Sequence, residues 1–145
     1  MKDELLRLAD LCEKATAQDW ELNATIASGL GWVKYDNPTH AGGLIDMWAS
    51  PEGVSKRWHL PNYTGSIDAA MTLVEPTWHC GMGRDGNLHN PTRSWAWVRY
   101  QFEGAWCETE NVWVLGEPAL ALCAAALRAR AFLGDAKCPK ISHKS

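Results

Sequence analysis

Hydrophobic residues repeat at helical spacing over the first thirty residues, which predicts two amphipathic helices. The first spans Lys2 to Ala15, with charged residues on the opposite side. Its predicted buried side consists of Leu5, Leu8, Leu11, Cys12 and Ala15. Asp19 is placed to cap the second helix, which Leu22, Ile26 and Leu30 continue until the glycines before Trp32.

The middle of the chain predicts short strands around a loop. A strand should start at Trp32, and turn-forming residues from Asp36 to Gly43 predict a long loop. Leu44 to Trp48 and Ser55 to Leu60 are predicted as two more strands, the second ended by Pro61.

Pro61 to Val74 (PNYTGSIDAAMTLV) predicts an extended segment that passes into a short amphipathic helix. Thr64 and Ser66 are both candidates for its N-cap, and Asp68 lies in the first turn, where the helix dipole favours an acid. The predicted buried face consists of Ile67, Ala70, Met71 and Val74.

Two motifs carry a resemblance to a known family. YTGSIDAAMTLV, followed at a distance by EPALALCAAALRARA, resembles the phage ABA sandwich domain proteins, a family of small phage and prophage proteins. The resemblance covers most of the chain and implies a helix–sheet–helix sandwich without a settled activity. The segments 36–55 and 83–93 match the family pattern least.

The second half of the chain predicts an antiparallel sheet. Thr77 to Met82 reads as one strand, Ser94 to Glu103 as a long second one and Ala105 to Leu115 as its hairpin partner across a Glu103-Gly104 turn. The predicted cross-strand pairs are Gln101 with Trp106, Arg99 with Glu108, Trp97 with Glu110 and Trp95 with Val112. The opposite charges of Arg99 and Glu108 favour this register over a one-residue slip. The core face should then carry Ala96, Val98, Tyr100 and Phe102.

Pro118 suits the first turn of a final helix, which Gly134 should end. Its predicted buried stripe consists of Leu120, Cys123, Ala124, Leu127 and Ala131. The chain is therefore predicted as one α+β domain over residues 1–134, an antiparallel sheet packed with helices, followed by a loose tail over 135–145.

Composition narrows the function classes. The 145 residues are 46% hydrophobic, which suits one domain with a core, and 14 basic against 17 acidic residues give a net charge of −3. This balance provides no electrostatic reason to bind nucleic acid or a membrane surface. No apolar run approaches the roughly 20 residues of a membrane span, and the N-terminus lacks a signal-peptide pattern, so we expect a cytoplasmic protein with five reduced cysteines.

Motif searches give little support for an enzyme. Gly81 to Gly86 spells GxGxxG, but the residues after it cannot open a helix, so a dinucleotide site is rejected. What remains is a loop, flanked by Arg84 and Arg93, that either holds an anionic group or is a plain hairpin loop. His79, Cys80, His89 and Cys107 lack the spacing of a zinc site. We expect no metal, no cofactor and no catalytic residue.

Nine tryptophans are the unusual feature of the composition. Several of them share the predicted hairpin face with charged residues, an arrangement that suits a nucleobase-like ligand or a partner protein. The candidate ligand-binding residues are Trp95, Trp97, Arg99, Trp106 and Glu108, with Arg84 and Arg93 from the loop. The alternative is that another helix covers this face.

Three function classes follow. The favoured one is a non-enzymatic phage accessory protein that sequesters a small anionic, nucleotide-like ligand during evasion of host defence. The second is an interaction module that inhibits a host protein, and the third is a small hydrolase or nuclease without a visible motif. A homo-oligomer is expected, because closed symmetric assemblies are common.

Overall fold

The computed structural model describes residues 2–38, 44–52, 56–57, 60–87, 90–133 and 141–142. Within them the helices are α1 (Lys2–Lys14), α2 (Trp20–Gly29), α3 (Ile67–Met71) and α4 (Pro118–Leu133). The strands are β1 (Val33–Pro38), β2 (Leu44–Ala49), β3 (Lys56–Arg57), β4 (His79–Asn87), β5 (Asn90–Phe102), β6 (Ala105–Glu108), β7 (Val112–Val114) and β8 (Ile141–Ser142). The predicted α+β class, with antiparallel sheets packed with helices in a single domain, is confirmed.

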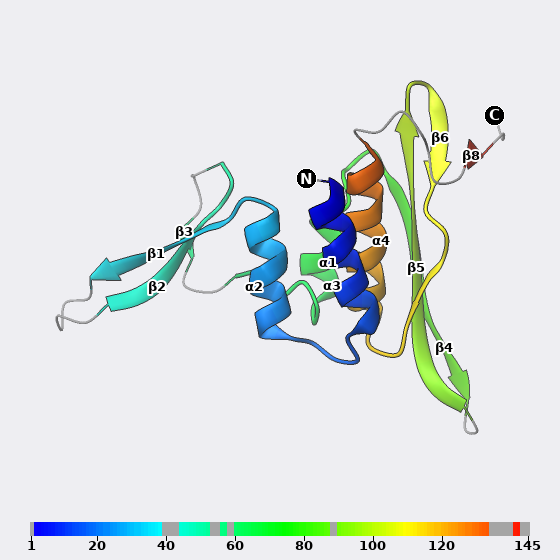
Figure 1. The fold of residues 1–145 in the computed structure, drawn as a ribbon. Coiled ribbons are helices and arrows are strands. Elements are labelled where there is room, and N and C mark those ends of the chain that lie inside the picture. Colours follow the sequence, from blue (N-terminus) through cyan, green and yellow to red (C-terminus); the bar gives the residue numbers. More distant parts are fainter. Residues whose placement is uncertain are drawn as a thin grey trace.

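The helices lie between two sheets of different size (Figure 1). The larger sheet has the order β4-β5-β6-β8, with β7 also paired to β5, and the smaller has the order β1-β2-β3. In Figure 1, α4 lies next to the larger sheet with α1 beside it, and the smaller sheet extends beyond α2 as an arm. Among the described residues, no helix covers the far side of the larger sheet, which we call the outer face.

The central hairpin of the larger sheet follows the predicted turn. Glu103 and Gly104 both have positive φ, 50° and 82°, as a two-residue turn that matches the strand twist requires. Arg99 lies opposite Glu108 and Gln101 opposite Trp106, so this part of the predicted register is confirmed.

Beyond Glu108 the predicted register is wrong by one residue, because β6 and β7 are separated by a bulge. Trp95 lies opposite Trp113 rather than Val112, and Val112 lies opposite Ala96. Thr109 holds the bulge together: its N–H donates to the Val98 carbonyl, and its hydroxyl oxygen accepts from the Val98 N–H, both at 2.9 Å. A side-chain oxygen therefore takes the place of a strand carbonyl.

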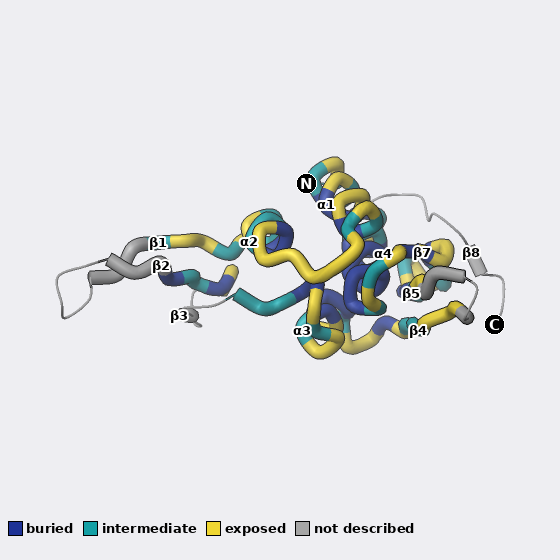
Figure 2. The backbone as a smooth tube through the Cα atoms, turned by 90° about the horizontal axis from the view of Figure 1, so that it is seen from below, coloured by how far each residue is buried: buried dark blue, intermediate teal, exposed yellow. Residues whose placement is uncertain are grey.

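Small residues let the helices approach each other and the sheet closely. Helix α4 carries its predicted buried stripe and also buries Ala119, Ala121, Ala125, Ala126 and Ala129. Figure 2 shows almost the whole of this helix in the buried colour. Because α1, α3 and the larger sheet all pack against it, α4 is buried on nearly every side rather than along one stripe.

The Pro61–Val74 stretch is anchored by a buried polar cluster. Asn23 of α2 is fully buried, and its side-chain oxygen accepts from both the N–H and the hydroxyl of Thr64, at 2.9 and 2.8 Å. The Asn23 amide also donates to Asn62 at 2.8 Å. With Thr64 engaged in this way, Ser66 caps α3 and accepts from the N–H of Ala69.

The predicted buried face of α3 is half wrong. Ala70 and Val74 are buried as expected, but Ile67 is 45% exposed and Met71 38% exposed. Leu73 is buried in their place. Leu73 and Val74 come after the last residue of α3, Met71, so the burial lies mainly in the turn that follows the helix, which helical spacing alone does not reveal.

Other predictions also need correction. Residues 83–93 are not a long loop, because β4 continues to Asn87 and β5 begins at Asn90. The predicted tail contains β8, which pairs with Trp106 and Cys107 of β6. Cys107 is disulfide-bonded, so the expectation of five reduced thiols is wrong at this position. Residues 39–43, 58–59 and 134 lie outside the described residues.

Candidate functional site

The outer face of the larger sheet collects large side chains from neighbouring strands. Successive residues of a strand point to opposite faces, so the residues that alternate with buried Ala96, Val98 and Tyr100 on β5 point outward. On this face lie His79, Gly81, Gly83 and Asp85 of β4, Arg93, Trp95, Trp97, Arg99 and Gln101 of β5, Trp106 and Glu108 of β6, and Trp113 of β7. Of the seven predicted site residues, six therefore share one surface.

Two indole rings lie against the backbone of β4. Gly81 pairs with Trp97 and Gly83 with Trp95. A Cβ placed on Gly81 would lie 2.6 Å from Cε2 of Trp97, and one on Gly83 would lie 2.6 Å from Cζ2 of Trp95. Each ring occupies the space that a side chain would fill, so its opposite side is directed away from the sheet. Both tryptophans remain partly exposed.

Arg99 lies between the rings and the charged part of the face. Its guanidinium carbon is 5.6 Å from the centre of the Trp97 ring, within the range of a cation–π contact. One of its terminal nitrogens is 3.4 Å from a carboxylate oxygen of Glu108. The side chain is 35% exposed, and its Nε has no hydrogen-bond partner among the described residues. The Nε atom is shielded from solvent, so a ligand would contact the terminal nitrogens of the guanidinium.

The two ends of the outer face carry further aromatic contacts. His79 and Trp106 lie with ring centres 5.0 Å apart and tilted by 44°. At the other end, the guanidinium of Arg93 lies 4.2 Å from the ring centre of Trp113, which is 41% exposed. Arg93 therefore lies on the outer face as part of strand β5, rather than in the predicted loop.

Arg84 does not belong to this site. It pairs with Ser94, whose side chain is buried on the helix side of the sheet, so Arg84 points to the inner face. There it forms an ion pair with Glu117 beside the start of α4. The sequence placed Arg84 in a loop, whereas its position in a strand decides which face it joins.

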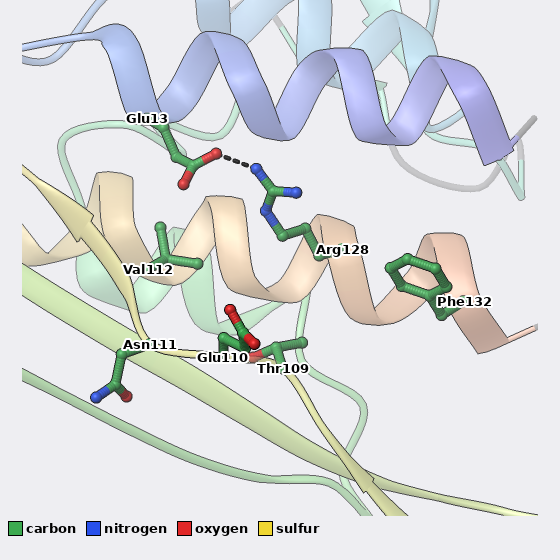
Figure 3. Close-up of a pocket in the computed structure, with 7 residues that line it drawn as sticks. All are labelled: Glu13, Thr109, Glu110, Asn111, Val112, Arg128 and Phe132. Atoms are coloured by element: carbon green, nitrogen blue, oxygen red, sulfur yellow. Dashed lines mark hydrogen bonds and ion pairs between the residues drawn. The ribbon is translucent and has the colours of Figure 1, made fainter. Parts of the chain in front are cut away.

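A first cavity, of about 430 Å³, lies where α1 and α4 meet the bulge between β6 and β7 (Figure 3). Its lining comprises Glu13, Thr109, Glu110, Asn111, Val112, Arg128 and Phe132. Arg128 is already paired with Glu13 and, at 2.9 Å, with Asp10. With two carboxylates neutralising this cation and Glu110 nearby, the cavity does not favour an anionic ligand.

A second cavity, of about 410 Å³, lies between the end of α2, the turn at Pro51 and helix α4. Its lining includes Trp32, Tyr63, Glu75 and Arg130. Arg130 donates to the Leu73 carbonyl at 2.7 Å and pairs with Glu75 at 3.1 Å. Its charge is therefore used within the fold, and the outer face remains the better candidate for an anionic ligand.

Two of the free thiols, Cys80 and Cys123, are poor nucleophiles. Burial raises the pKa of Cys80, and a hydrogen bond with Cys12, together with burial, raises the pKa of Cys123 well above its usual value. Both groups therefore stay protonated near neutral pH, and the thiolate is the reactive form. Over the described part of the chain, no three His, Cys, Asp or Glu residues are grouped to hold a metal ion. His89 lies outside the described residues.

Sequence reasoning missed three features of the outer face: His79, Trp113 and the glycine positions under the two indoles. The signal was present in HCGMGRD, where glycines alternate with larger residues. The predicted strand stopped at Met82 and the loop began at Gly83, which concealed that the alternation continues and that a strand places both glycines on one face.

No family model, curated protein or solved structure matches this chain. The resemblance to the phage ABA sandwich domain proteins thus stays a prediction from two motifs. None of the helices in the described ranges is long and apolar enough to cross a membrane.

Proposed function

We propose that the outer face of the larger sheet binds a small anionic, nucleotide-like ligand. The observation that supports this most directly is the pair of indoles, Trp95 and Trp97, that lie against glycines and turn one side away from the sheet. Stacking on an aromatic side chain contributes about 1–3 kcal/mol per base and tolerates any base. Arg99 lies beside the Trp97 ring and Arg93 over the neighbouring Trp113 ring, and each can hold a phosphate by paired hydrogen bonds.

The charges of the face indicate how such a ligand would be held. Arg93 and Arg99 are balanced by Asp85 and Glu108 on the same face. Stacking would therefore supply most of the affinity, and the arginines would orient the phosphate. In this proposal the chain is a cytoplasmic phage accessory protein that binds and sequesters its ligand without catalysing a reaction. The assignment to a phage rests on the motif resemblance alone.

The test is calorimetric titration of the wild type, Trp97→Ala and Arg93→Ala with a panel of mononucleotides and cyclic nucleotides. Each variant should bind at least tenfold more weakly, because losing about 1.4 kcal/mol changes an affinity tenfold. Trp20→Ala is the matched control, since Trp20 is 57% exposed at the start of α2. The proposal fails if the wild type binds no member of the panel, or if Trp20→Ala weakens binding as much as Trp97→Ala.

A second candidate function is an interaction surface for a host protein. The outer face combines tryptophan and arginine, the residues that dominate binding energy at protein interfaces, and it is a sheet surface rather than an enclosed cavity. Capture of one host protein by the wild type but not by Trp97→Ala, without any nucleotide binding, would favour this function.

A further inference from the structure

We infer that two copies of this chain pair antiparallel through strand β4, which joins their outer faces into one continuous surface. Strand β4 lies at one end of the larger sheet, and β5 is its partner there. Among the described residues, no other strand pairs with it. In an edge strand every second residue directs its N–H and C=O groups outward, where they can pair with another chain.

Strand β4 has little protection as an exposed edge from His79 to Gly83, because its charged residues, Arg84 and Asp85, and its irregularity lie toward its end. It is nine residues long, whereas protected edges are short or carry proline, lysine or a bulge. Its sequence, HCGMGRDGN, contains neither proline nor lysine, and its pairing with β5 is regular from His79 to Asp85, with the irregularity after Asp85. The regular part has Met82 at its centre.

The side chains favour self-pairing centred on Met82. In that register His79 lies opposite Asp85 of the second copy, so an imidazole N–H faces a carboxylate at both ends of the paired segment. Met82 lies opposite Met82, and Cys80 lies opposite Arg84. A register centred on Arg84 would place two guanidinium groups opposite each other, which is unfavourable.

The same register extends the aromatic surface across the junction. Gly81 of one copy lies opposite Gly83 of the other. In each copy the indole of Trp97 lies over Gly81 and that of Trp95 over Gly83. Four indoles would therefore meet around the twofold axis, two from each copy. This consequence for the ligand surface rests on the proposed function, whereas the pairing itself does not.

Cysteine cross-linking without ligand tests the pairing and its register. Opposite residues in an antiparallel pair have Cα atoms about 4.5–5.5 Å apart, which lies within the range of a disulfide. Met82→Cys in a Cys80→Ala background should form a covalent dimer on mild oxidation. Arg84→Cys should form a covalent dimer through Cys80 of the second copy. The same variant in the Cys80→Ala background should form no such dimer. Glu103→Cys, in the turn at the far end of β5, is the control.

Light scattering of the reduced protein at about 100 µM should give twice the monomer mass of 16.1 kDa. Asp85→Arg should weaken self-association at least tenfold, because it removes the carboxylate that faces the imidazole of His79 in the second copy, whereas Glu103→Arg should not. A monomer by scattering, together with no faster cross-linking of Met82→Cys than of Glu103→Cys, would overturn the inference. Cross-linking without nucleotide binding would instead support the pairing and reject only the proposed ligand.

Discussion

The two faces of strand β5 differ in burial, and its two tryptophans lie on the more exposed face. The inner face carries Ala96 and Val98, both fully buried, and the outer face carries Trp95 and Trp97, both partly exposed. Ala96 and Val98 are small where α4, with its many alanines, packs close to the sheet. Tyr100, on the same face, is large and fully buried, and its ring packs against Trp78. The large rings lie outside, where glycines leave space for them. The size of a side chain therefore follows the space its neighbours leave.

The faces also differ in how completely their polar groups are used. On the inner face Thr109 satisfies the N–H of Val98 at the bulge, whereas on the outer face Nε of Arg99 has no partner in the described part of the structure. The inner face therefore contributes to the stability of the fold, and the outer face is the surface on which we propose ligand binding.

Placing a charge on the inner face should have the largest effect. Val98→Asp buries an unpaired carboxylate, which costs several kcal/mol and is comparable to the total stability of about 5–15 kcal/mol of a typical domain. We expect loss of cooperative thermal unfolding by circular dichroism. Gln101→Asp, on the exposed outer side of the same strand, should melt close to the wild type. Equal melting of both variants would show that the two faces are not distinct.

Removing the Thr109 hydroxyl should have the next largest effect. Thr109→Val leaves the buried N–H of Val98 without its acceptor, which costs about 1–3 kcal/mol. Thr109→Ser keeps the hydroxyl and should retain most of the stability. Urea unfolding of both variants measures the difference. If valine and serine have the same effect, the hydroxyl does not hold the bulge.

Adding a methyl group under the indole tests the contact between Trp97 and Gly81. Gly81→Ala places a Cβ 2.6 Å from the ring and should cost about 1 kcal/mol as overpacking. In a Trp97→Ala background the same substitution should cost much less, because the ring is absent. A double-mutant cycle by urea unfolding gives the coupling energy. A coupling near zero would mean that the ring does not lie on Gly81.

Breaking the Arg99–Glu108 pair should have the smallest effect on stability. The two groups are 3.4 Å apart and partly exposed, and pairs of this kind contribute about 0.2–1 kcal/mol. Glu108→Gln should therefore lower the melting temperature only slightly. It also removes a negative charge beside Arg99, so nucleotide affinity should rise in calorimetry. A fall in affinity would indicate that Glu108 contacts the ligand or positions Arg99 for it.

Features that depend on local sequence could be predicted without the structure. Helices α1, α2 and α4 follow from apolar spacing and capping residues. The hairpin turn follows from Gly104, because glycine readily adopts the positive φ that such a turn needs. The pairing of Arg99 with Glu108 follows from the length of that turn. Strand alternation then placed Trp95, Trp97 and Arg99 on one face.

Features that depend on distant contacts came from the tertiary structure. The bulge at Thr109 shifts Trp95 from Val112 to Trp113, because the extra residue is held by bonds to Val98 across the sheet. The face on which Arg84 lies depends on the register of β4 against β5, in which Gly81 and Gly83 pair with Trp97 and Trp95. A shift of that register by one residue would move every side chain of the strand to the other face. Periodicity and turn chemistry act within a few residues, whereas these outcomes depend on which backbone groups meet across the fold.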